Sequence, residues 1–361
     1  MSAPVRRLLV GAALAVLCTL PAASQSGIRH VVVITLDGLR WQEFFTGADR
    51  SYFKREKDGK PGAAEQRFWR ATVPDRRMAL MPFVWTTIAS RGQVFGDPAS
   101  DSVSHLTNGL WFSYPGYSEM FTGMADPRIN SNDKVPNPNV TVLEWLNQRP
   151  GFEGRIAAFG AWDVLPYILN VSRSTLVVGS GFEPYPQASS PDERAINDLA
   201  ADLPRLWDYG PVDAPIVYAA LEYARVKQPR VFYIMLGEGD EWAHEGRYDL
   251  YLDATHRADR YIERVWTTLQ SMPEYANQTA LVITTDHGRG ATKKDWNDHG
   301  EKIPAAQRTW MAMLGNGVAP LGVRHGATVT TSQIAATIAS LAGEDFKQAN
   351  PRAAAAIDLS H

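Results

Sequence analysis

Cysteine is almost absent from this 361-residue sequence. The single cysteine, Cys18, lies in the N-terminal segment, so the rest of the chain has no thiol for a disulfide or a thiolate metal site. Stability must then come from a hydrophobic core, and from any metal that carboxylate and imidazole side chains bind. With 45% hydrophobic residues, the chain is long enough for one large core or two smaller ones.

The sequence also lacks an excess of charge of one sign. Its formal net charge is −3, and its lysines and arginines form no stripe of the kind that binds a polyanion. Nucleic-acid polymers are therefore not expected as partners.

A long hydrophobic run is missing as well. The apolar stretch Leu8–Leu20 follows Arg6 and Arg7 and is too short to span a bilayer comfortably. This pattern is typical of a secretory signal peptide, with an uncleaved N-terminal anchor as the alternative. We expect residues 1–24 to be removed on export and residues 25–361 to form a single secreted or periplasmic domain, with no membrane attachment beyond the signal.

Three segments have the composition of buried strands. They are "HVVVITLDG" (30–38), "RVFYIMLGEGD" (230–240) and "TALVITTDHG" (279–288). Each is a continuous apolar run without alternation, which is typical of strands covered on both faces in a parallel sheet.

Helix patterns separate these strands. Residues 190–207 begin with a capping box, whereas residues 250–270 and 331–343 each carry one apolar face. The alternation predicts an α/β fold with a central, mostly parallel sheet sandwiched by helices. Residues 95–140, rich in Gly, Asn, Asp and Pro, are expected to form loops over a sheet edge.

Acidic residues stand at the ends of the three predicted strands. Asp37, Asp240 and Asp286 each follow an apolar run, and ligands of open α/β sheets bind beyond the carboxyl ends of the strands. Three carboxylates at neighbouring strand ends therefore indicate a binding site.

Histidines accompany these acids. His244 follows Asp240 by four residues, His287 follows Asp286 directly, and His299 lies in "WNDHGEKIP". Carboxylate and imidazole ligands without thiolates suit Zn²⁺ first and Mn²⁺ second. The six side chains are enough for two ions, and two ions together can promote displacement at phosphorus.

A hydroxyl nucleophile is available in "GLWFSYPGYSEMFTG" (109–123). Ser113 precedes Pro115 and a short segment that could form a helix ending near Gly123. Both the helix dipole and the dication favour the alkoxide form of a hydroxyl that lies at a helix N-terminus beside the ion.

The order of these motifs resembles the alkaline phosphatase superfamily. Asp37, "SYPGYSEMFTG", "DEWAH", "TTDHG" and "HGEKIP" follow one another as in that family. The similarity runs from about residue 29 to about residue 343 and points to the nucleotide pyrophosphatase/phosphodiesterase and related bacterial phosphatase branches. It implies an alkaline-phosphatase-like fold.

The resemblance also implies roles for individual residues. Seven side chains are implied as metal ligands, three for one ion (Asp240, His244 and His299) and four for the other (Asp37, Asp286, His287 and Ser113). Ser113 would attack a phosphate ester to form a covalent phosphoserine, which is then hydrolysed.

The sequence offers several candidates for contacts with the substrate. Relatives use an asparagine downstream of the nucleophile to hold a phosphoryl oxygen, and this chain offers four, namely Asn130, Asn132, Asn137 and Asn139. Four side chains are taken as candidate substrate-binding residues: Asn132, Asn137, Trp162 and Arg173.

Some features of the superfamily are missing. Relatives often have asparagine at the position of Gly116. The region 159–174 has no Lys-x-Arg pair for a dianionic phosphate, which weakens the case for a monoesterase. No arginine follows Pro115 at the spacing that the sulfatase signature requires.

Two site residues have rivals in the sequence. His325 competes with His299, which we favour because "HGEKIP" follows the family pattern, and Ser118 competes with Ser113 but would point away from the strand ends. His256 lies on a charged helix and is expected to be solvated.

These observations predict a metal-dependent hydrolase of small-molecule phosphate mono- or diesters. The alternatives are a phosphoryl transferase or mutase, a phosphonate hydrolase on the same scaffold, or a non-catalytic metal-binding relative. The sequence leaves the physiological substrate and the oligomeric state open.

Overall fold

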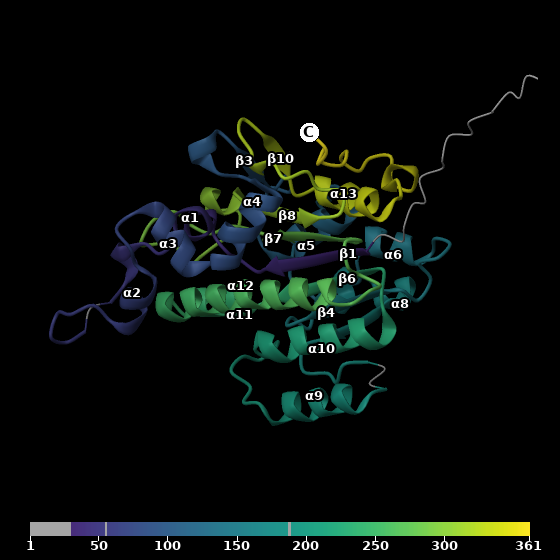
Figure 1. Cartoon of the computed structure of the whole chain (residues 1–361), viewed down its shortest axis with the longest axis horizontal. Coiled ribbons are helices and arrows are strands. Elements are labelled where there is room, and N and C mark those ends of the chain that lie inside the picture. The colour runs from purple at the N-terminus through teal and green to yellow at the C-terminus, as the bar shows by residue number, and fades with distance from the viewer. Residues whose placement is uncertain (1–29, 55, 187–188) are drawn as a thin grey trace, which may run out of the picture.

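A computed structural model describes residues 30–54, 56–186 and 189–361 (Figure 1). The predicted signal peptide lies outside these residues. Within them, no helix has both the length and the apolar character that crossing a membrane requires.

An eight-stranded sheet runs through the middle of the fold (Figure 1). In spatial order its strands are β5 (Val177–Ser180), β4 (Ile156–Gly160), β6 (Val231–Leu236), β1 (His30–Leu36), β7 (Thr279–Thr284), β8 (Met311–Gly315), β2 (Gln93–Phe95) and β9 (Gly322–Val323). Neighbouring strands pair in parallel except at β8, which is antiparallel to both β7 and β2. The predicted mostly parallel sheet is confirmed.

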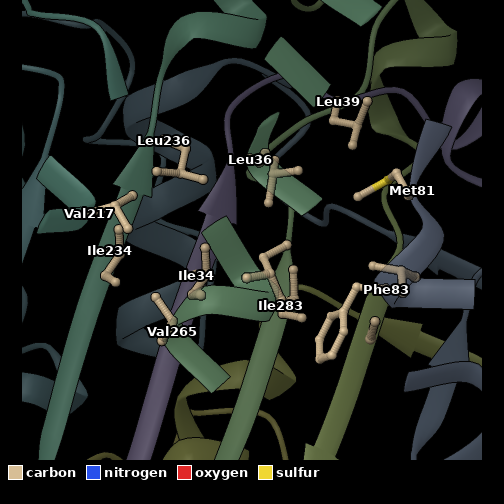
Figure 2. Packing of buried hydrophobic residues seen from close by; sticks show 14 of the residues in the cluster. Ile34, Leu36, Leu39, Met81, Phe83, Val217, Ile234, Leu236, Val265 and Ile283 are labelled. Atoms are coloured by element: carbon tan, nitrogen blue, oxygen red, sulfur yellow. The ribbon is translucent and has the colours of Figure 1, made fainter. Parts of the chain in front are cut away.

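The central strands are buried on both faces because helices cover each side. In β1, Val32, Ile34 and Leu36 pack into one core layer, while Val31 and Val33 pack into the other. Figure 2 shows the first layer, where Ile34 and Leu36 lie beside residues of neighbouring strands and helices. Burial on both faces explains why these strands have no polar alternation.

Two groups of helices form these layers. The first packs on the Ile34 side: α1 (Trp41–Thr46), α2 (Ala63–Phe68), α3 (Val73–Leu80), α10 (Asp213–Lys227), α11 (Glu238–His244) and α12 (Tyr248–Gln270). The second packs on the Val33 side: α5 (Ser113–Thr122), α6 (Val142–Asn147), α7 (Leu165–Ile168) and α13 (Gln333–Ala342). The remaining α-helices of the described residues are α4 (Ala89–Arg91), α8 (Val171–Ser174) and α9 (Pro191–Asp202).

The predicted elements are present, with two corrections. The helix expected over 190–207 has its capping box at Ser190 and Glu193 but ends at Asp202, as α9. The stretch 95–140 is not loop alone, because β3 (Val103–His105) pairs with β10 (Thr328–Thr330). Within the same stretch, α5 is the short helix that was expected to end near Gly123.

The strand register brings the predicted acids together. Thr35 pairs with Thr284, and two residues further along both strands are Asp37 and Asp286. On the other side Leu36 pairs with Leu236, so the chain after β6 leads into α11 beside Asp37. The carboxyl ends of β6, β1 and β7 therefore form one edge that carries the candidate site.

Candidate active site

Six predicted ligand side chains and Ser113 meet at this edge of the sheet. Asp37 follows β1, Asp286 and His287 follow β7, Asp240 and His244 lie on α11, and His299 comes from the loop after β7. The possible ligand atoms lie within 4.8 Å of one another in each of two triplets, namely Asp37–Asp286–His287 and Asp240–His287–His299. The structure thus brings together residues that are up to 262 positions apart, from Asp37 to His299.

The first group is centred on His287. Its Nε2 atom lies 3.4 Å from Asp37 Oδ1 and 3.4 Å from Asp286 Oδ2, and Ser113 Oγ lies 3.3 Å away. His287 Nδ1 donates its proton to the carbonyl oxygen of Gly288 (2.9 Å), since a carbonyl can only accept. That bond leaves the Nε2 lone pair directed at the carboxylates, as a metal-binding imidazole requires.

Hydrogen bonds hold one oxygen of each carboxylate and leave the other free. Tyr117 Oη donates to Asp37 Oδ2 (2.9 Å), and the Gly38 N–H donates to Asp286 Oδ1 (3.1 Å). Asp37 Oδ1 and Asp286 Oδ2 are buried and have no hydrogen-bond partner among the described residues. Two unpartnered carboxylate oxygens that face one imidazole nitrogen fit a divalent cation.

The pKa shifts of Asp286 and His287 also indicate that this group favours a bound positive charge. Burial and the neighbouring Asp37 raise the pKa of Asp286 well above its usual range. Burial opposes protonation of His287, yet Asp286 and Asp37 outweigh it and raise the His287 pKa to about 9. A proton is therefore held among these groups, and a dication bound at the same place would displace it.

Asp240, His244 and His299 form the second group. His244 Nε2 lies 3.1 Å from Asp240 Oδ2 and 3.0 Å from His299 Nε2. Burial, with the nearby His287, lowers the pKa of both His244 and His299, so both are neutral imidazoles that can bind a metal.

His287 stands between the two groups. Its Nε2 atom is 3.9 Å from Asp240 Oδ1, and its ring stacks on His299 with a centroid separation of 4.0 Å. Because Nε2 lies nearer to Asp37 and Asp286, we place His287 with those two carboxylates.

Arg289 is a site residue that the sequence analysis missed. Its side chain is fully buried, and Nη2 contacts Asp240 Oδ1. Nη1 donates to the carbonyl oxygen of Asn297 (2.8 Å) and Nε to that of Gly38 (3.1 Å). The guanidinium therefore ties together helix α11 and two loops that carry ligands, and it balances part of the negative charge. Its one sequence signal is its position directly after Asp-His-Gly.

Ser113 is the first residue of α5, and its place depends on a close approach of that helix to β7. A Cβ atom at Gly116 would lie 2.4 Å from the carbonyl oxygen of Asp286. Glycine therefore lets the N-terminus of α5 reach the strand end, which explains why this chain has no larger residue there. Glu119 supports the preceding loop through Asn108, whose side-chain oxygen accepts from the Trp111 N–H (3.0 Å).

A hollow of about 530 Å³ opens over Ser113 and the second ligand group. Among the predicted substrate residues, Asn132 and Trp162 line it. Asn132 Oδ1 accepts from the Tyr114 N–H (3.0 Å), so its amide N–H groups remain for another partner. Asn132 is the one of the four candidate asparagines that lines this hollow.

Asn137 and Arg173 are not brought to the hollow. Asn137 is buried, donates to Ser118 Oγ (3.1 Å) and accepts from the Asn139 N–H (3.0 Å). Arg173 is paired with Glu144 at 2.7 Å. Both are occupied by contacts that hold neighbouring segments in place.

The rival residues lie elsewhere. Ser118 is buried against Asn137, away from His287, and His325 is exposed in the loop after β9. His256 is not simply solvated as predicted: it is partly buried, and its Nδ1 donates to the carbonyl oxygen of Leu80 (2.9 Å).

Comparison with protein families finds a match to the model of "Type I phosphodiesterase / nucleotide pyrophosphatase" over residues 47–353. Comparison with curated protein sequences gives no significant match.

Solved structures of alkaline-phosphatase-like proteins share the fold. Murine ectonucleotide pyrophosphatase/phosphodiesterase 5, in an inactive form with AMP, is 12% identical over 91% of this chain and 97% of its own, with a TM-score of 0.53. The lipoteichoic acid synthase LtaP of Listeria monocytogenes is 9% identical over 89% and 73%, with a TM-score of 0.55. The phosphonate monoester hydrolase of Agrobacterium radiobacter is 13% identical over 87% and 74%, with a TM-score of 0.53.

The substitution Gly116→Ala tests the close approach of α5. The added Cβ meets backbone that cannot rotate away, so we expect a loss of about 1–3 kcal/mol in the free energy of unfolding, measured with denaturant. Gly62→Ala is the matched control, because its new Cβ would lie 3.2 Å from the flexible end of Glu56 and meet backbone only at an ordinary contact distance, 3.8 Å from the carbonyl oxygen of Lys54. Equal stability of the two variants would contradict the close approach.

Metal dependence of thermal unfolding tests the ligand cluster. Zn²⁺ at about 100 times its Kd should raise the Tm by about 5 °C over the chelated protein, because the ion binds only the folded site. Asp286→Asn should reduce this shift, since it removes one of the two buried charges. A Tm that does not change when chelator is added, or a full Tm shift in Asp286→Asn, would contradict metal binding at this cluster.

Proposed function

Because the chain belongs to the type I phosphodiesterase/nucleotide pyrophosphatase family, we propose that it hydrolyses phosphate esters through a covalent phosphoserine at Ser113. The observation that supports this most directly is the position of Ser113 Oγ, 3.3 Å from His287 Nε2 and inside the cluster of carboxylates and imidazoles. A binding or storage protein would need the ligands but not the hydroxyl.

Two divalent ions, Zn²⁺ or Mn²⁺, are the proposed cofactors. Asp37, Asp286, His287 and Ser113 would hold one, and Asp240, His244 and His299 the other. When bound, such ions favour an alkoxide and stabilise the charge that develops on phosphoryl oxygens.

The chain's own groups prepare Ser113 for attack. The hydroxyl stands at the N-terminus of the ten-residue helix α5, whose dipole favours negative charge at that end. Asn132 lines the same hollow, and its amide N–H groups, which have no acceptor among the described residues, would donate to a non-bridging phosphoryl oxygen.

The proposed reaction consists of two successive displacements at phosphorus. In the first, the Ser113 Oγ–phosphorus bond forms as the bond from phosphorus to the leaving oxygen breaks, and the alcohol departs with a proton. In the second, water attacks phosphorus, the Oγ–phosphorus bond breaks, and Ser113 recovers its proton.

The charge of the hollow favours a diester over a monoester. Among its lining residues Lys134 is the only lysine or arginine, and it is paired with Asp163 at 2.7 Å. Five acids line the same space: Asp37 and Asp240, whose charge the proposed ions would offset, and Asp133, Asp163 and Glu241, which lie outside the two ligand sets. A monoanionic diester is repelled less by this surface than a dianionic monoester, and a phosphonate monoester has the same advantage.

We also propose that the protein acts outside the cytoplasm on a small-molecule ester. The signal-peptide pattern in residues 1–24 supports export, and the net charge of −3 disfavours a nucleic-acid polymer as partner.

Replacement of the nucleophile separates a hydrolase from a metal-binding protein. Ser113→Ala should lower kcat on bis-(4-nitrophenyl) phosphate by about 10³-fold or more while the bound metal, measured by elemental analysis, stays near the wild-type content. Ser118→Ala on the same helix is the control and should keep turnover per folded molecule. Chelator-sensitive turnover that survives Ser113→Ala would refute the phosphoserine, and tight metal binding without turnover of any ester by the wild type would refute the hydrolase.

A further inference from the structure

Arg289 lies at the metal-ligand cluster but has no part in the proposed hydrolysis. Its side chain is fully buried, and its guanidinium contacts Oδ1 of Asp240. Burial lowers the pKa of Arg289 to about 9, so the group still carries a positive charge at neutral pH. A buried cation therefore lies against a carboxylate that is also proposed to bind a metal ion.

Three further contacts hold the guanidinium in this position. Nε donates to the carbonyl oxygen of Gly38 (3.1 Å), Nη1 to that of Asn297 (2.8 Å) and Nη2 to that of Asp240 itself (3.3 Å). The surrounding space is narrow, since a Cβ at Gly38 would lie 2.8 Å from Nε. Because buried N–H groups are costly to leave without acceptors, we expect the side chain to stay beside Asp240 when a metal binds.

The two carboxylate oxygens of Asp240 have different neighbours. Oδ1 faces Arg289, whereas Oδ2 lies 3.1 Å from His244 Nε2. One oxygen thus remains for an ion that the histidines of the second set would also bind. The charge of Asp240, however, is shared between that ion and the guanidinium, which weakens the attraction that the ion alone would receive.

The two ligand sets differ in charge. The first has two carboxylates, Asp37 and Asp286, and neither forms an ion pair with a lysine or arginine among the described residues. The second has one carboxylate, Asp240, together with two neutral imidazoles. A divalent ion would be neutralised in the first set but would leave net positive charge in the second, where it also meets Arg289.

Two other acids near the second set do not remove this difference. Among the described residues, Glu241 and Asp298 form no ion pair with Arg289 or with the histidines of the set. Asp298 is exposed, so solvent and salt screen its charge. Even with Glu241 ionised, Asp240, Glu241 and Arg289 together carry one net negative charge, against two in the first set.

The two sets also differ in their access to solvent. In the first set, the side chains of Asp286 and His287 are fully buried, whereas His244 in the second is 44% exposed. Water can therefore reach an ion at the second set directly, and such an ion exchanges more readily than one enclosed by protein.

We propose that Arg289 makes the set Asp240, His244 and His299 the weaker of the two metal sites, so that the ions bind in order and the second exchanges with free metal. The inference rests on the proposed function, because it requires two ions at these two ligand sets. The concentration of free metal then determines how much of the protein carries both ions.

Titration of the chelator-treated protein with Zn²⁺, followed by calorimetry, tests the proposal. The wild type should show two binding steps whose Kd values differ by at least about tenfold. Arg289→Gln removes the charge and keeps amide donors for the nearby carbonyls, so it should strengthen the weaker step and bring the Kd values to within about threefold. Arg289→Lys keeps the charge and should retain the wild-type difference. The matched control Arg173→Gln, which breaks the ion pair with Glu144 outside the cluster, should retain it too.

Two ligand variants assign the binding steps to the two sets. His244→Ala should abolish the weaker step and leave the tighter one, whereas Asp286→Asn should weaken the tighter one. If His244→Ala instead removes the tighter step, the order of the two sites is reversed and the proposal is wrong.

The sign of the change separates an electrostatic role of Arg289 from a purely structural one. If the guanidinium only holds the ligand-bearing segments in place, Arg289→Gln should weaken zinc binding, and this result would overturn the proposal. Arg289→Met, with an apolar side chain of similar length, repeats the test with the same expected result if Arg289→Gln does not fold. Two equal steps in the wild type would contradict the inference and leave the proposed hydrolase intact, whereas a wild type that binds no zinc would refute the proposed cofactors as well.

Discussion

The burial of two carboxylates at adjacent strand ends is the constraint on which the rest of the site depends. Asp37 and Asp286 leave the sheet side by side because β1 and β7 are parallel neighbours in register. Each keeps one oxygen without a hydrogen-bond partner among the described residues, and burial of such groups is unfavourable without a cation. A bound dication would resolve this conflict, so the feature that is unfavourable for folding would be the one that binds the ion.

The neighbouring structure serves to keep these carboxylates in place. Tyr117 orients Asp37, while Gly116 on the same helix allows α5 to approach Asp286 closely enough to present Ser113. Gly38 has a φ of 59°, and a Cβ there would lie 2.6 Å from Asp240 Oδ1. The space that this glycine leaves is where Arg289 reaches Asp240, so the charge balance of the second ligand group depends on backbone geometry beside the first.

Much of this arrangement was predictable from the sequence, and the remainder depends on packing. Continuous apolar runs that end in Asp37, Asp240 and Asp286 identify the buried strands and the edge that carries the site. Sequence alone did not choose Asn132 among four nearby asparagines, because that choice depends on how the loop folds back over Tyr114. Arg173 resembled a phosphate-binding residue, but Glu144 lies next to it in the fold. Arg289 was overlooked because no periodicity or spacing indicates that a guanidinium will be buried between helix α11 and two loops.

Crystals grown with Zn²⁺ and measured at the zinc absorption edge would test whether each of the two ligand sets holds a divalent ion. We expect two anomalous peaks, each about 2.0–2.2 Å from its ligand atoms. One would lie among Asp37, Asp286 and His287, and the other among Asp240, His244 and His299. A single peak shared through His287, or none at this edge of the sheet, would contradict it.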